Sequence, residues 1–113
     1  MKVSRPWGSY TIFTKNENTT VKIISLKAGH RTSLQFHKYR TEKWFVISGT
    51  GIAELLTKHD LKPGVELVIP KTKPHRLEAV TDLMVLEISY GQFDESDIVR
   101  LDDDYCRTIK KNL

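Results

Sequence analysis

Short apolar segments separated by chain-breaking residues recur along most of this chain. The segments are rich in β-branched or large apolar side chains, and the breakers between them contain glycine, proline or an aspartate. Strands of this length with turn signals at this interval predict an antiparallel β-sandwich or barrel. The expected strands are 21–26, 32–37, 43–47, 52–56, 65–69, 76–80 and 83–89. Only the tail, 102–113, lacks a strand pattern, and we expect a short helix or a frayed end there.

Length and charge limit the function further. With 113 residues the chain fits one compact domain, 1–113, and its net charge of +4 suits an anionic small ligand. The excess of basic residues, 18 against 14 acidic ones, is too small to indicate nucleic-acid binding. No apolar run is long enough for a membrane span or a signal peptide, so we expect a cytoplasmic protein that does not bind membranes.

Four side chains with nitrogen or oxygen donors are spaced as a metal site requires. In 32–37, Gln35 and His37 alternate with apolar neighbours, so a strand there points both donors to one face. A turn then allows Glu42 to come from the next strand, and His75 comes from a more distant one. This set predicts one divalent ion, with zinc, manganese, cobalt, nickel and iron all open.

The spacing resembles the two cupin motifs, which read G, five residues, HxH, three or four residues, E, six residues, G, and then G, five residues, PxG, two residues, H. Here the first motif runs over 29–49 with Gln35 in place of the first histidine, and the second runs over 64–75 with Thr72 in place of a glycine. An amide oxygen is a weaker ligand than imidazole. The resemblance implies an all-β fold, a cupin-type antiparallel jelly-roll barrel that can enclose a small ligand.

A closer resemblance, to the type II mannose-6-phosphate isomerases, extends over 5–107. In that family the cupin usually forms the C-terminal part of a longer enzyme whose N-terminal part is a mannose-1-phosphate guanylyltransferase. The family commonly reads QxHxHRAEHW, so Gln35 is regular, whereas Tyr39 and Lys43 stand where it often has histidine and Cys106 stands where it usually has glycine. The segments that carry the resemblance are Arg5-Pro6-Trp7-Gly8-Ser9-Tyr10, Ser33-Leu34-Gln35-Phe36-His37, Glu42-Lys43-Trp44, Ser48-Gly49-Thr50, Ile69-Pro70, Pro74-His75-Arg76-Leu77-Glu78, Asp97-Ile98-Val99-Arg100 and Asp104-Tyr105-Cys106-Arg107.

This resemblance implies a metal-dependent isomerase that interconverts mannose 6-phosphate and fructose 6-phosphate. The metal ligands would be Gln35, His37, Glu42 and His75, and the catalytic candidates are Arg40, Glu42 and Lys43. Arginines suit a phosphate group because a guanidinium donates paired hydrogen bonds. We expect Arg40 and Arg76 to bind it first, with Arg31 and Arg100 behind them. The chain is too short to hold the guanylyltransferase, and we expect a homodimer, as in many similar cupins.

Two other functions remain open from the sequence. One is a non-catalytic sugar-binding or regulatory cupin, which the replacement of histidine at Tyr39 and Lys43 favours. The other is an isomerase or epimerase acting on a nucleotide sugar. The general base of an isomerase is also undecided, because several side chains could serve: Glu54, Glu78, Glu87, His30, His59 and Lys43.

Overall fold

Eleven β-strands build the part of the chain that this computed structural model describes, residues 1–107, and no helix occurs there. Accordingly, those residues contain no helix of the length and apolar character needed to cross a bilayer. The strands are β1 (Lys2–Arg5), β2 (Gly8–Thr11), β3 (Thr19–Leu26), β4 (Leu34–Phe36), β5 (Thr41–Ser48), β6 (Gly51–Glu54), β7 (Lys58–Leu61), β8 (Glu66–Ile69), β9 (Arg76–Ala79), β10 (Leu83–Tyr90) and β11 (Val99–Asp102).

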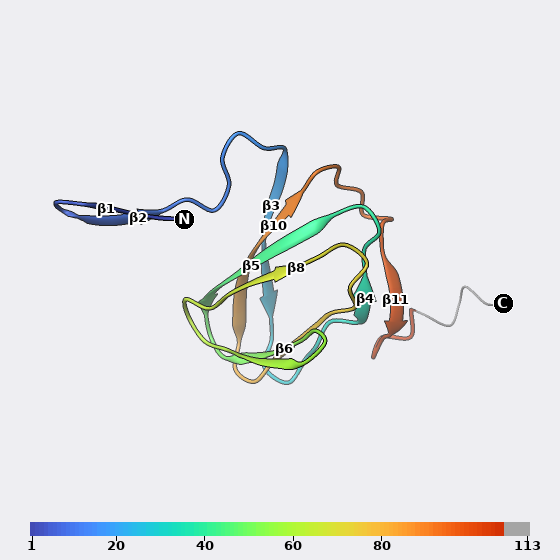
Figure 1. Cartoon of the computed structure of the whole chain (residues 1–113). Coiled ribbons are helices and arrows are strands. Elements are labelled where there is room, and N and C mark those ends of the chain that lie inside the picture. The colour runs from blue at the N-terminus through green and yellow to red at the C-terminus, as the bar shows by residue number, and fades with distance from the viewer. Residues whose placement is uncertain (108–113) are drawn as a thin grey trace.

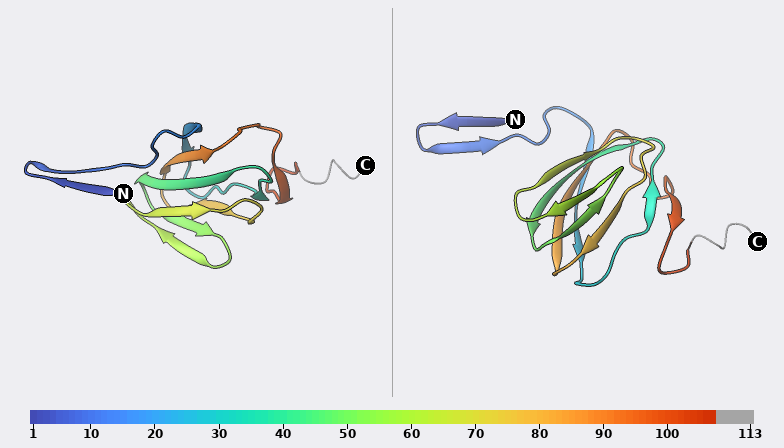
Figure 2. Two further views of the ribbon diagram at one scale, coloured as in Figure 1. Left: turned by 45° about the horizontal axis from the view of Figure 1, so that its top comes forward. Right: turned by 60° about the horizontal axis from the view of Figure 1, so that its bottom comes forward.

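The strands form two antiparallel layers and a separate hairpin. One layer is the four-stranded sheet β3-β10-β5-β8. The other consists of β7-β6-β9 and the pair β11-β4, which backbone bridges between Gln35 and His75 and between Arg31 and Glu78 join together. The hairpin β1-β2 extends away from the barrel, while β4 and β11 lie side by side at the end remote from it (Figures 1 and 2).

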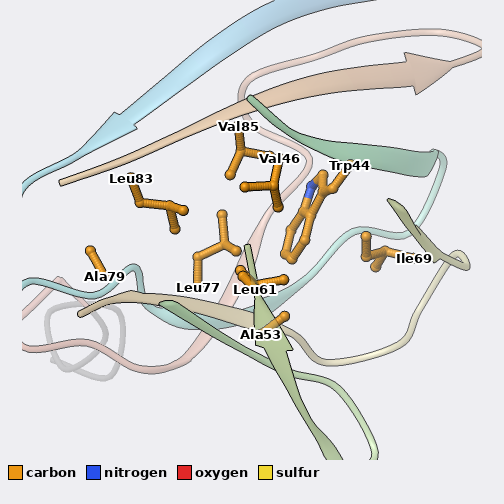
Figure 3. Close-up of a cluster of buried hydrophobic side chains, with 9 residues drawn as sticks. All are labelled: Trp44, Val46, Ala53, Leu61, Ile69, Leu77, Ala79, Leu83 and Val85. Carbon is orange, nitrogen blue, oxygen red and sulfur yellow. The ribbon is translucent and has the colours of Figure 1, made fainter. Parts of the chain in front are cut away.

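The hydrophobic core fills the space between the two layers (Figure 3). Along β5 the buried positions alternate with half-buried ones, so Trp44 and Val46 point inward together with Glu42. This alternation is the pattern of a strand with one face on a core. The buried cluster takes residues from both layers: Trp44, Val46, Ile69, Leu83 and Val85 from the four-stranded sheet, and Ala53, Leu61, Leu77 and Ala79 from the facing one.

All seven expected strands are present, so the predicted all-β antiparallel barrel is confirmed. Four further strands, β1, β2, β7 and β11, were not predicted. The tail also differs from the prediction, because β11 runs to Asp102 and residues 103–107 form turns rather than a helix. The remainder of the expected tail helix, 108–113, lies outside the described residues.

Candidate metal centre

Three buried donor residues meet inside the barrel at the end where β4 lies. Glu42 points inward from β5, His37 follows β4, and His75 directly precedes β9. The His37 Nε2 atom lies 3.4 Å from Glu42 Oε2, and the His75 Nε2 atom lies 3.6 Å from Glu42 Oε1. One ligand atom from each residue lies within 4.8 Å of the others, which is close enough for all three to bind one ion. The buried His/Glu/His cluster can therefore hold a metal.

Backbone carbonyls orient both imidazole rings. The His37 Nδ1 atom lies 2.6 Å from the carbonyl oxygen of Asp97, and the His75 Nδ1 atom lies 2.9 Å from that of Lys73. A carbonyl oxygen only accepts hydrogen bonds, so each Nδ1 carries the proton and each Nε2 keeps its lone pair. This is the arrangement that orients histidine ligands in metal sites, and it turns both lone pairs toward Glu42.

Burial keeps the two imidazoles neutral. Loss of solvent lowers the pKa of His37, and it lowers the pKa of His75 to about 4, despite the hydrogen bond from His75 to the Lys73 carbonyl. Neutral imidazole is the form that binds metal ions. Each ring lies near the Glu42 carboxylate, but a neutral imidazole forms no ion pair with it near neutral pH. The Nε2 lone pairs can instead bind a metal ion.

The cluster lacks a hydrogen-bond donor between His75 and Glu42 among the described residues. The Nε2 lone pair of His75 and the Oε1 atom of Glu42 face each other, and neither buried atom has a hydrogen-bond partner within the described chain. Two buried acceptors without a donor between them are unfavourable, and a cation between them removes the cost. The donor set, two imidazoles and a carboxylate, therefore fits a divalent transition-metal ion such as zinc, manganese, cobalt, nickel or iron.

Comparison with known proteins agrees with this geometry. Residues 1–103 match the protein family described as mannose-6-phosphate isomerase C-terminal. The chain belongs to this family.

Among its relatives, the Xanthan biosynthesis protein XanB of Xanthomonas campestris pv. campestris (strain B100) is 40% identical over 95% of this chain. The mannose-1-phosphate guanylyltransferase ManC of Salmonella typhimurium (strain LT2) is 34% identical over 94% of it. This chain spans only 24% and 23% of the length of those two proteins. It thus corresponds to the C-terminal domain of a bifunctional isomerase and guanylyltransferase family.

A solved structure supports the cupin fold independently. The capsular polysaccharide assembling protein CapF from Staphylococcus aureus superposes with a TM-score of 0.68, at 22% identity, over 90% of this chain and 34% of CapF. The cupin-type barrel expected from the two motifs is confirmed. At this identity the likeness concerns the fold alone.

Gln35, the fourth expected metal ligand in this mannose-6-phosphate isomerase C-terminal domain, lies next to the cluster. Its side-chain nitrogen is 3.4 Å from His37 Nε2, while its oxygen accepts a hydrogen bond from the buried Ser33 hydroxyl. The side-chain oxygen, which would be the ligand atom, is thus bound to Ser33. A half turn of the amide, which exchanges oxygen and nitrogen, would direct the oxygen toward His37.

Arg40 is the only one of the expected arginines that contacts the cluster. Its Nε donates to Glu42 Oε2 at 2.9 Å, and its Nη2 lies 3.3 Å from His37 Nε2. The guanidinium is buried and lies over the ring of Phe93, 4.4 Å from its centre. Arg40 therefore compensates part of the Glu42 charge and holds that carboxylate in place.

The other expected substrate-binding arginines differ in their contacts. Arg31 is paired with Asp104, and Arg76 donates to Thr32 O and to Asp102, so both are held by contacts outside the cluster. Arg100 pairs with Gln35 across β11 and β4, and its buried Nε has no hydrogen-bond partner among the described residues. Directly paired residues of antiparallel strands point to the same face, so Arg100 lies on the Gln35 side of the sheet.

Lys43, the third expected catalytic residue, is not brought to the cluster. It lies between Glu42 and Trp44 on β5 and therefore points to the opposite face, where its Nζ donates to the Phe13 carbonyl at 3.2 Å. A catalytic role for Lys43 receives no support from this position.

Two residues outside the expected metal-ligand and substrate-binding sets also shape the site. Asp97 accepts backbone hydrogen bonds from Lys38 and Tyr39 through its carboxylate and binds His37 through its carbonyl. Glu87, on β10, is buried and pairs with Trp44 on the neighbouring strand β5. Asp97 occurs in one of the motifs of the family resemblance, but its contact with His37 joins residues 60 positions apart and leaves no local signal.

Proposed function

We propose that this chain is a metal-dependent isomerase domain that interconverts mannose 6-phosphate and fructose 6-phosphate. The observation that carries the proposal is the buried His37–Glu42–His75 cluster, in which the His75 Nε2 lone pair and the Glu42 Oε1 atom face each other with no hydrogen-bond donor between them among the described residues. Membership of the mannose-6-phosphate isomerase C-terminal family supplies the substrate class. The isomerase activity of the longer relatives would then reside in this part of the chain.

His37, Glu42 and His75 would hold the ion, with Gln35 as a fourth ligand after its amide turns. A bound divalent ion acts as a Lewis acid, which polarises the sugar carbonyl and favours loss of the neighbouring carbon-bound proton. Arg40 would keep the Glu42 carboxylate oriented through its 2.9 Å hydrogen bond. The buried Trp44 and the half-buried Phe93 would limit the access of water to the reacting carbons.

Arg100 is the best placed arginine for the phosphate group. Its unpartnered buried Nε and its position beside Gln35 leave a donor available next to the proposed centre. Arg31 and Arg76 would first have to give up their carboxylate partners. We therefore propose Arg100 as the first phosphate contact, with Arg40 as the nearest additional positive charge.

The alternative of a non-catalytic binding module rested on the missing histidines at Tyr39 and Lys43. Tyr39 is 69% exposed, and Lys43 points to the outer face of β5. Neither position contributes a donor to the buried cluster, so their replacement removes no ligand from it. The two replacements therefore no longer favour a binding module over an enzyme.

The test measures metal binding and isomerisation on the same sample. We expect the metal-free chain to gain thermal stability with manganese, zinc, cobalt, nickel or iron, by about 2.7 kcal/mol at 100 times the dissociation constant. The loaded protein should convert mannose 6-phosphate to fructose 6-phosphate, and chelation should abolish the conversion. His75→Ala should lose both properties. A loaded, folded protein that binds mannose 6-phosphate without forming ketose would support the binding module instead.

A further inference from the structure

Glu87 is a buried carboxylate inside the barrel that the proposed metal centre does not use. It lies on β10 between Val85 and Ser89, and all three point inward. Ser89 pairs with Glu42, and Glu87 pairs with Trp44, in the register of β10 against β5. Residues two apart on a strand are about 7 Å apart on one face, so Glu87 lies one such step from the proposed ligand Glu42.

Glu87 has two partners, one toward the cluster and one toward solvent. The Trp44 Nε1 atom donates to Glu87 Oε1 at 3.2 Å, and the same indole ring packs edge-on against His75 with ring centres 5.5 Å apart. On the other side, Lys22 Nζ lies 3.2 Å from Glu87 Oε2 and its side chain is 40% exposed. The Glu87 carboxylate therefore links Trp44, which packs against the proposed ligand His75, to a lysine that is exposed to solvent.

The other candidates for a general base lie less favourably. Glu78 is exposed, Lys43 points to the outer face, and His30 is exposed and bonded to Tyr105. His59 and Glu54 lie on β7 and β6, at the edge and centre of the other layer, and neither is buried. Glu87 alone among the six combines full burial with an inward direction and a contact to a residue that touches the metal cluster.

We propose that Glu87 is the proton-transfer group of this site, with Lys22 as its charge partner and its link to solvent. This inference rests on the proposed isomerase function. The Glu87 carboxylate takes the proton from C2 of mannose 6-phosphate, and the electrons of that C–H bond form a C1–C2 double bond while the carbonyl electrons move onto O1. The carboxylic acid then returns its proton to C1, the hydroxyl proton of O2 passes to O1, and C2 becomes the carbonyl carbon of fructose 6-phosphate. No oxidant or further reactant is needed.

The environment of Glu87 suits a group that both takes and returns a proton. Burial, together with the nearby Glu42 carboxylate, raises its pKa, while Lys22 and the Trp44 hydrogen bond act in the opposite direction. A carboxyl group with a raised pKa is a stronger base when it is ionised. Lys22, which also lies over the Phe93 ring, offers a route by which the bound proton exchanges with water.

The experiment follows the C2 proton of mannose 6-phosphate in deuterated water by proton NMR, with metal-loaded wild type and variants. Glu87→Gln keeps the size of the side chain and an oxygen to accept from Trp44, but it cannot take a proton. We expect exchange and ketose formation to fall at least about 100-fold, the usual contribution of a general base, while metal binding and sugar-phosphate binding persist. Glu66→Gln, at an exposed position of β8, is the matched control and should behave as wild type.

The possible results distinguish the role of Glu87 from the proposed isomerase function. If wild type exchanges the proton and Glu87→Gln stays within threefold of it, the inference is overturned while the proposed function stands. If wild type binds metal but neither exchanges the proton nor forms ketose, both fail. Should Glu87→Gln not fold, Glu87→Asp takes its place, because it keeps the charge and withdraws the carboxylate by one methylene. At least a tenfold loss of exchange supports the inference, and unchanged exchange contradicts it.

Discussion

At the scale of single residues, two backbone carbonyls determine the chemistry of the candidate centre. The carbonyls of Asp97 and Lys73 fix the protons of His37 and His75 on Nδ1 and leave Nε2 available. The spacing of the two cupin motifs predicted which donors meet, and the cluster of His37, Glu42 and His75 agrees with it. The ring orientations were not predictable, because the Asp97 contact depends on a loop distant in sequence.

The contacts of the arginines were less predictable for the same physical reason. Sequence position placed Arg76 beside His75, an expected ligand, but adjacent residues of a strand point to opposite faces, and Arg76 turns to Asp102. Arg100, placed behind Arg40 and Arg76 from sequence, lies beside Gln35 because β11 pairs with β4. Pairings between distant strands therefore decide which cations approach the site.

The neutral state of His75 predicts a pH dependence of stability in the metal-free protein. Its pKa is about 4 in the folded chain and about 6.5 in the unfolded chain. Between these values the unfolded state binds the proton more readily, so stability is constant above about 6.5 and falls as the pH drops toward 4. The loss should reach about 3 kcal/mol at most.

Urea unfolding of the metal-free protein at several pH values measures this loss. Wild type should lose more stability between about pH 6.5 and 4.5 than His75→Gln, which has no imidazole to protonate at this position. The comparison of slopes removes the contribution of the carboxylates that both proteins share. Equal slopes would contradict a buried, neutral His75.

At the scale of secondary-structure elements, the predictable strands were those with an apolar face on the core. β7 was not predicted because Lys58, His59 and Asp60 give it a polar sequence, although Leu61 packs in the core. β1 and β2 bury no core residue, and β11 pairs only with the short β4. A strand that draws its stability from backbone pairing at an edge leaves little pattern in the sequence.

Two motif glycines are expected to differ in their tolerance of a side chain. Gly49 and Gly64 both have positive φ values, 86° and 92°, which disfavour any other residue. A Cβ atom at Gly64 would meet nothing within 4 Å, whereas one at Gly49 would overlap the backbone carbonyl of Asp82, which cannot move without shifting the start of β10.

Gly64→Ala should therefore cost about 1 kcal/mol through backbone strain alone. Gly49→Ala adds a clash with main-chain atoms and should cost about 3 kcal/mol or more. Chemical denaturation of both variants, with and without metal, measures the difference. Similar losses in the two variants would mean that the β5–β6 turn adjusts more freely than its contact with Asp82 suggests.

At the scale of the whole molecule, two apolar features are left uncovered in a single chain. The outer face of the four-stranded sheet exposes Val21, Ile23 and Val68 by more than half of their surface, with Ile47 and Met84 beside them. The β1-β2 hairpin extends from the barrel and exposes Trp7 and Tyr10, which stack on each other. An isolated two-stranded hairpin is marginally stable in water, and an apolar patch of this kind marks an interaction surface.

We expect a second copy of the chain to cover this sheet face, which gives the homodimer predicted from sequence. A two-fold axis brings the same patch from both copies together, and the hairpin of each copy then has a neighbour on which to pack. Ile23→Asp places a charge in the middle of the patch on β3 and should shift the mass measured by light scattering from dimer to monomer. Val80→Asp, at a similarly exposed valine outside this sheet, is the matched control and should leave the mass unchanged. A wild-type protein that is monomeric at high micromolar concentration would contradict the expectation and leave the outer sheet face for a different partner.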